Sequence, residues 1–226
     1  EDGDLSIGTV SYLSYETELS DGELQGGAFK VKRSYITIKK KLFKHLGFRI
    51  TVDAHQDETG DMKARLKYVY AHYKFDDWGF ITNPNIEFGL VHMPWLDFEE
   101  HINYYRMQGT MFMERSGLFN SADFCFTLGG YFGGELDNEY QKKVNKKYPG
   151  RYGSFAVGVY NGGGYHAMEN VNNKTIEGRV TLRPLPDIIP GFQISYFGIF
   201  GKGNKSYGLD LVPDWQNNAV MLCYEH

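Results

Sequence analysis

The chain has 226 residues, a formal net charge of −4 and 42% hydrophobic residues, a length that suits one domain or at most two. This charge provides no general attraction to nucleic acid, and no segment approaches the roughly 20 apolar residues of a transmembrane helix. Aromatic residues make up 16% of the chain, and 27 glycines stand against 7 prolines. These proportions favour strands joined by tight turns, and they are also typical of a barrel with aromatic girdles at two membrane surfaces.

Alternating apolar and polar side chains predict about ten β-strands. In residues 48–55 the apolar side chains share one face, while Arg49, Asp53 and His55 lie on the other. The expected strands are residues 7–16, 29–42, 48–55, 63–75, 86–93, 122–132, 154–160, 176–183, 192–200 and 219–224. Many of these runs have about ten residues, the length with which a tilted strand crosses a bilayer, whereas strands of soluble proteins usually have about five or six.

The connections between these strands differ in length. Residues 44–47 and 57–61 form short turns, whereas residues 136–150 and 161–174 are long and rich in glycine, asparagine or charge. Short turns at one end and longer loops at the other are typical of outer-membrane barrels. The basic run at residues 142–147 lies in one of the long connections, and we interpret it as a solvated loop rather than a phosphate-binding patch.

Residues 94–118 break the strand pattern. A connection of this length is uncommon in a compact fold and is often functional, so we expect it to fold inward as a constriction loop. Asp97 is expected to cap a short helix there. Glu114 and Arg115 are candidates for an ion pair that anchors the loop to the wall, or for a direct role at the constriction. Trp95 is a candidate for packing or for stacking on a sugar ring.

A metal site and a cofactor are not predicted. His92 and His101 flank two glutamates without any of the recognised zinc spacings. The two cysteines, Cys125 and Cys223, match no metal motif, and the sequence leaves open whether they pair.

In a barrel, the apolar face of each strand meets lipid and the polar face lines the lumen. The predicted lumen residues are Arg49, Asp53, His55, Lys63, Arg65, Lys67, Glu177, Arg179 and Arg183. Bases outnumber acids in this set, and rings of arginine and lysine favour anions in a narrow pore. Lys30, Lys32 or Arg33 would add to them, although the alternation shifts near Ser34, as expected at a β-bulge. The alternative is that these charges only keep the lumen hydrated.

Three stretches also carry a likeness to a known family. They are Phe29-Lys30-Val31-Lys32-Arg33-Ser34-Tyr35-Ile36, then Phe88-Gly89-Leu90-Val91-His92-Met93-Pro94, and finally Phe112-Met113-Glu114-Arg115-Ser116 followed by Leu128-Gly129-Gly130-Tyr131-Phe132-Gly133. In this order and spacing, over about residues 5–200, the chain resembles the phosphate-selective porin O and P family of Gram-negative bacteria. The resemblance implies an outer-membrane barrel of about 16 strands that assembles as a homotrimer and passes small solutes or anions such as phosphate. Because fewer strands are predicted here, we expect a part of such a barrel, or a smaller barrel of about ten to twelve strands.

The sequence therefore predicts an all-β fold, a transmembrane antiparallel β-barrel in one domain over residues 1–226. Its function would be passive diffusion of small polar solutes or ions across the bacterial outer membrane, with an anion preference and no nucleic-acid partner. The alternative is a soluble β-sandwich that binds carbohydrate. An outer-membrane barrel enzyme would use residues such as Asp53, His55 and His72, but the chain has no Gly-x-Ser-x-Gly elbow, so we expect no enzymatic activity.

Overall fold

The computed structural model describes residues 4–169, 171–204 and 212–226, and in these residues ten strands form one sheet in chain order. The strands are β1 (Leu5–Ser20), β2 (Glu23–Lys41), β3 (Leu46–Gln56), β4 (Met62–Lys74), β5 (Ile81–His92), β6 (Ala122–Phe132), β7 (Gly153–Tyr160), β8 (Thr175–Leu182), β9 (Phe192–Lys202) and β10 (Asp214–Tyr224). Each predicted strand overlaps one of these. The prediction of an all-β, antiparallel fold is therefore confirmed, and β1 and β10 stand at the two ends of the strand order.

By its internal contacts the chain divides into two compact units, Glu1–Val69 and Tyr70–His226, and β4 runs from the first into the second. The first unit is built around the long β1–β2 hairpin. Asp21 and Gly22 join its strands with φ angles of 53° and 83°, the left-handed pair that a two-residue hairpin turn requires. The prediction of a single domain over the whole chain stays a prediction.

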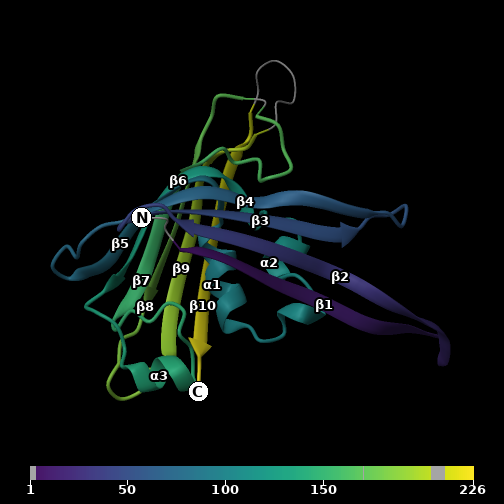
Figure 1. The fold of residues 1–226 in the computed structure, drawn as a ribbon, viewed down its shortest axis with the longest axis horizontal. Coiled ribbons are helices and arrows are strands. Elements are labelled where there is room, and N and C mark those ends of the chain that lie inside the picture. The colour runs from purple at the N-terminus through teal and green to yellow at the C-terminus, as the bar shows by residue number, and fades with distance from the viewer. Residues whose placement is uncertain (1–3, 170, 205–211) are drawn as a thin grey trace. The chain divides into compact units, whose positions relative to one another are not determined.

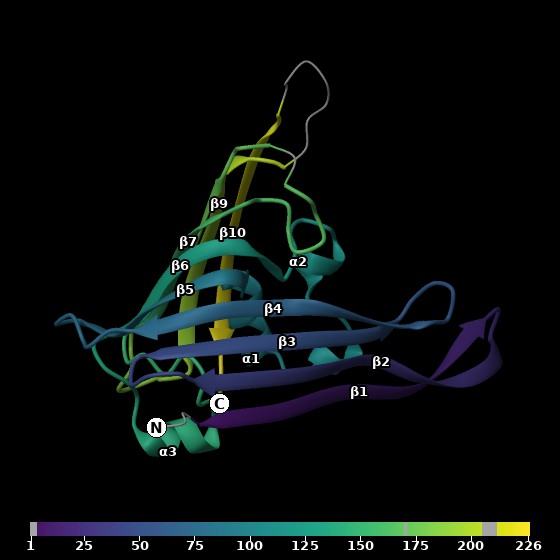
Figure 2. The ribbon, with the colours of Figure 1, turned by 45° about the horizontal axis from the view of Figure 1, so that its top comes forward.

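The register of this hairpin shifts at two points, between Tyr12 and Leu13 and again between Thr17 and Leu19 near the turn. Tyr12 lies opposite Arg33, but Leu13 lies opposite Val31, so Lys32 is the extra residue of a β-bulge. The predicted change of phase is thus confirmed, two positions from Ser34. Strand β3 pairs with residues 34–41 of β2, and beyond the bulge the distal part of the hairpin extends past β3 (Figure 2).

In the second unit, β6 to β10 lie side by side (Figure 1). The connection between β5 and β6 carries the helices α1 (Pro94–Ile102), η1 (Arg106–Gln108) and α2 (Phe112–Arg115). A further helix, α3 (Asn138–Lys143), begins where the carboxylate of Asp137 accepts the N–H of Tyr140, an ordinary N-cap. The sequence had predicted a loop, and no helix, over residues 136–150.

Helix α1 begins with Pro94, directly after the extended residue Met93. Proline is well placed there because the first N–H groups of a helix have no partner within it. The prediction that Asp97 caps this helix is wrong, since Asp97 lies within its first turn. Among the described residues, none of the helices is long and apolar enough to span a membrane. The thiols of Cys125 and Cys223 are free.

Candidate pore wall and inward segment

Strand β8 buries its polar face and exposes its apolar face. Glu177 and Arg179 are 2% and 1% exposed, whereas Ile176 and Leu182 are 53% and 51% exposed. The same alternation continues in β9, where Ser195 is fully buried between exposed apolar neighbours. A sheet of a soluble protein buries its apolar face instead. The inverted pattern is that of a barrel wall whose outer face meets hydrocarbon.

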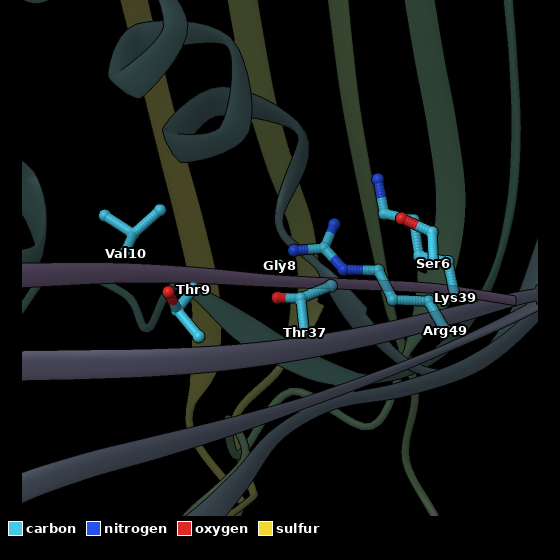
Figure 3. A pocket seen from close by; sticks show the side chains of 7 residues that line it. All are labelled: Ser6, Gly8, Thr9, Val10, Thr37, Lys39 and Arg49. Carbon is cyan, nitrogen blue, oxygen red and sulfur yellow. The ribbon is translucent and has the colours of Figure 1, made fainter.

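The polar face of the first unit holds a shallow pocket of about 250 Å³ (Figure 3). Its lining residues are Ser6, Gly8, Thr9, Val10, Thr37, Lys39 and Arg49. Lys39 and Arg49 are direct neighbours across β2 and β3, and Figure 3 shows both side chains on the same side of the strands. Like charges directly opposite each other repel within a sheet.

Arg49 is also held in place by its own unit. Its Nε donates to Thr51 Oγ1 at 3.0 Å, and its guanidinium carbon lies 4.7 Å from the centroid of the Tyr68 ring. Thr51 is buried and exchanges a hydrogen bond of 3.0 Å with Thr37. The hydroxyl of Thr51 and the ring of Tyr68 therefore orient Arg49 at the edge of the pocket.

Two arginines share one carboxylate on the same face. Asp53 Oδ2 lies 2.6 Å from Arg33 Nη1 and 3.1 Å from Arg65 Nη2, and the side chain of Asp53 is fully buried. Glu16 is bracketed in the same way, by Lys30 and Lys32 at 3.1 and 2.7 Å. Each of these groups joins two cations to one anion.

In the second unit, Arg179 anchors the connection between β5 and β6. Its Nε donates to the carbonyl oxygen of Pro94 and its Nη1 to Ser154 Oγ, both at 3.1 Å. The guanidinium carbon lies 4.5 Å from the centroid of the Phe98 ring. Arg179 therefore holds the first turn of α1 against β7 and β8. Its guanidinium is a charged donor, and hydrogen bonds from charged donors are stronger than those between neutral groups.

We call residues 94–121 the inward segment. Trp95 and Leu96 pack with Phe119 against Phe197 and Ile199 of β9 in one buried apolar cluster, and the ring centroids of Trp95 and Phe197 are 5.8 Å apart. Here, unlike elsewhere on β9, apolar side chains occupy the inner face. Phe197 and Ile199 thus form an apolar contact surface for α1, here called the seat, and the inward segment packs against it.

A second connection reaches the same helix. Residues 144–148, here called the strap, lie between α3 and β7. Val144 O accepts from Tyr104 Oη at 3.1 Å, and Asn145 Nδ2 donates both to His101 O at 3.1 Å and to Glu225 Oε1 at 2.6 Å. The strap therefore joins the last turn of α1 to the residue that follows β10. The lysines of the basic run at residues 142–147 are exposed, as a solvated stretch requires, whereas Val144 and Asn145 are half-buried.

The carboxylate of Asp97 lies where wall, helix and strap meet. Its Oδ2 is 3.8 Å from His92 Nε2 on β5 and 3.6 Å from His101 Nδ1 on α1, and it accepts the hydroxyl of Tyr148 from the strap. His92 Nε2 also lies 3.4 Å from Glu87 Oε2. In the part of the chain that the structure describes, no three histidine, cysteine or acidic side chains are arranged to hold a metal ion.

A comparison with family models matches residues 13–183 to the model described as phosphate-selective porin O and P. The chain belongs to the phosphate-selective porin O and P family. Proteins of this porin family reside in the outer membrane of Gram-negative bacteria and are channels rather than enzymes. Comparisons with curated proteins and with solved structures gave no match.

Several of the residues predicted to line the lumen make contacts with other side chains or with the backbone. Besides the arginines described above, Lys67 is buried with its Nζ 4.9 Å from the Tyr35 ring centroid, and Lys63 Nζ lies 2.5 Å from Asp57 Oδ2. Arg183, directly after β8, donates to Gly150 O and is buried. The remaining two are the half-buried His55 and the buried Glu177. Their roles in lining the pore stay predictions.

The three predicted residues of the constriction loop lie on two helices, Trp95 on α1 and Glu114 and Arg115 on α2. Trp95 is buried in the apolar cluster, and its Nε1 donates to Glu99 Oε2 at 2.9 Å. Burial raises the pKa of the Glu99 carboxyl, against the opposing effect of this bond. Glu114 and Arg115 belong to α2, and among the described residues no ion pair joins them to the wall. The anchor is Arg179 instead.

Sequence reasoning missed two features of the porin. The seat of α1 had a signal, because residues 196–200 are apolar or glycine at every position rather than alternating, which is typical of a strand covered on both sides. The strap had none, since Asn145 and Tyr148 lie in a polar, lysine-rich stretch far from α1 in the sequence.

Proposed function

We propose that this porin is a passive diffusion channel of the outer membrane and that it prefers anions. The observation that carries the proposal is the inverted burial of β8 and β9, because an exposed apolar row needs hydrocarbon and a polar row suits an aqueous lumen. Solutes would pass along the polar face, past the inward segment. No step of this transport requires a cofactor or a chemical reaction.

The anion preference is supported by the charges of the polar face. Lys39 and Arg49 border one pocket without an acidic residue in its lining, and the groups around Asp53 and Glu16 each carry more cations than anions. Fixed positive charge stabilises an anion that has lost part of its hydration in a narrow pore. Phosphate, which the family name contains, is the first ion to test.

Two measurements test the proposal. The purified protein should need detergent and should migrate differently on gels before and after heating, whereas a soluble carbohydrate-binding sandwich would stay in solution without detergent. In planar bilayers with a salt gradient, the reversal potential should lie towards the anion equilibrium potential. A reversal at the cation potential would disprove the anion preference, and a water-soluble protein without conductance would disprove the channel. Crosslinking in detergent would test the homotrimer that we propose for the assembled porin.

A further inference from the structure

The inward segment packs on the seat near both of its ends but not in its middle. Leu96 near its start and Phe119 near its end belong to the buried apolar cluster. Within residues 103–110, all of which the structure describes, no residue is buried, and Tyr105 and Met107 are 70 and 53% exposed. A stretch with so little buried apolar surface opens easily, so hydrogen bonds from neighbouring elements matter more for its position.

Asn145 of the strap holds the last turn of α1, directly before this stretch. Its Nδ2 donates to His101 O at 3.1 Å and to Glu225 Oε1 at 2.6 Å. The last carbonyl groups of a helix lack partners within it, so the bond to His101 O satisfies an acceptor that the helix leaves open. Beside it, Tyr104 Oη donates to Val144 O at 3.1 Å. A single amide therefore connects the C-terminal end of α1 with the residue that follows β10.

The groups on both sides of this amide are fixed in turn. Asn145 Oδ1 accepts the backbone N–H of Lys147 at 2.8 Å, and the reverse orientation of the amide would turn its oxygen towards two acceptors. Glu225 is buried, and its Oε2 accepts Gln193 Nε2 of β9 at 2.9 Å. The backbone N–H of Glu225 also donates to Gly191 O at 3.1 Å. The carboxylate is thus anchored to β9, and Asn145 transmits that anchor to α1.

We propose that Asn145 is a positioning residue of the channel, which fixes the last turn of α1 to β9 through Glu225 and thereby sets the position of residues 103–110 in the lumen. The proposal rests on the proposed function, because the position of this stretch matters for transport only in a channel. It assigns to the connection between β6 and β7, which lies outside the inward segment, a part in shaping the constriction.

The first turn of α1 provides an internal reference for this proposal. It is held by Arg179 rather than by the strap amide, and the N–H of Asp97 in this turn donates to Met93 O at 3.1 Å. At the other end, the N–H of Asn103 donates to Glu99 O at 3.0 Å. Removal of the strap amide should loosen the second of these bonds and leave the first intact, whereas a general loss of stability would loosen both.

The test is hydrogen–deuterium exchange of the intact porin in detergent, followed at single amides, with Asn145→Leu as the variant. Leucine has a similar size but no amide group. The Asn103 amide should exchange about two- to tenfold faster than in the wild type, as expected for the loss of a hydrogen bond, and the Asp97 amide should exchange at an unchanged rate. Unchanged exchange at Asn103, or equal acceleration at both amides, would overturn the inference.

Single-channel recordings connect this measurement to transport. Asn145→Leu should show more closures and substates than the wild type, and faster exchange with unchanged recordings would also overturn the inference. The matched control is Asn172→Leu at an exposed position between β7 and β8, which should change neither readout. If no protein conducts, the wild type included, the proposed function fails, whereas the exchange rates still decide whether Asn145 fixes α1.

A second variant keeps the inference falsifiable if Asn145→Leu does not fold. Glu225→Met removes the anchor and leaves the strap amide in place, so it should also accelerate exchange at Asn103 and not at Asp97. Where both variants fold, the double variant should exchange no faster than the faster single variant, because both substitutions interrupt the same chain of bonds. An unchanged Asn103 amide in Glu225→Met, or effects that multiply in the double variant, would contradict the inference.

Discussion

Asp53 Oδ2 accepts hydrogen bonds from two arginines. This geometry determines the expected effect of removing the carboxylate. The carboxylate holds Arg33 and Arg65 at 2.6 and 3.1 Å, while Asp53 itself is inaccessible to solvent. Without it, two guanidinium groups would stand together on the polar face with no shared counter-charge. In a pore they would attract anions more strongly than the present group does.

Asp53→Asn should therefore shift the reversal potential of the porin further towards the anion value, by a step that shrinks as salt screens the charges. The expected size is a few-fold rise in the anion-to-cation permeability ratio at about 0.1 M salt. Asp187→Asn, which also removes one negative charge but lies in an exposed connection beside Arg151, should change the ratio much less. Equal effects of the two substitutions would contradict a specific role of Asp53.

The pKa of Asp57 is a second property that depends on contacts between individual residues. The bond from Lys63 is the main reason why its pKa is lowered from 3.8 to about 2, with help from the Thr59 hydroxyl and two backbone N–H groups. A lowered folded-state pKa means that the contribution of Asp57 to stability is complete above its ordinary value and is lost as the pH falls towards 2.

Lys63→Met should therefore raise the midpoint of the Asp57 titration towards 3.8, its ordinary value. NMR spectra of the porin in detergent micelles would follow it through the amide protons of Thr59 and Asp61, which both bond to Asp57 Oδ1. An unchanged midpoint would show that the turn, and not Lys63, sets this pKa.

At the scale of elements, the seat on β9 determines whether α1 stays folded into the lumen. Phe197 is fully buried and contacts the rings of both Trp95 and Phe119. Phe197→Ala should lower the free energy of unfolding by about 3–5 kcal/mol, the usual range for a buried aromatic side chain. The measurement is the urea midpoint of the gel-mobility change in detergent.

Phe200→Ala is the matched comparison, since the same side chain lies on the exposed face of the same strand, 45% exposed. It should cost clearly less. If both substitutions had equal effects, the seat would contribute no more to stability than the outer face does.

The strands could be predicted from the sequence because their signal is local. In β3 and β8 each apolar residue is followed by a polar one, and that alternation alone assigned Arg179 to the polar face. The position of α1 depends on Arg179 meeting Pro94 O, 85 residues away, and no period in the sequence encodes such a contact. The strap was missed for the same reason, because its exposed lysines gave no sign of the half-buried Asn145 and Tyr148 beside them.

For the whole molecule, the outer face of the strands is the surface that a bilayer must accept. Val180 lies on this face and is 43% exposed. Val180→Arg should hinder membrane insertion or refolding, because an arginine on the lipid side costs about 2–4 kcal/mol near the bilayer midplane. The readout is the yield of heat-modifiable porin after refolding into lipid vesicles.

Thr37→Arg is the corresponding control, since it places the same charge on the polar face, at the pocket of Lys39 and Arg49. It should refold with a clearly higher yield than Val180→Arg. Poor refolding of this control together with good refolding of Val180→Arg would reverse the assignment of the two faces.

The interior of β8 and β9 consists largely of hydroxyl, guanidinium, carboxyl and amide groups, among them Thr175, Thr181, Ser195 and Gln193. Hydration of polar surface lowers the heat capacity, whereas hydration of apolar surface raises it. The heat-capacity change on unfolding should therefore be smaller for this porin than for a water-soluble chain of equal length. Its stability would vary only gently between a cold environment and a warm one.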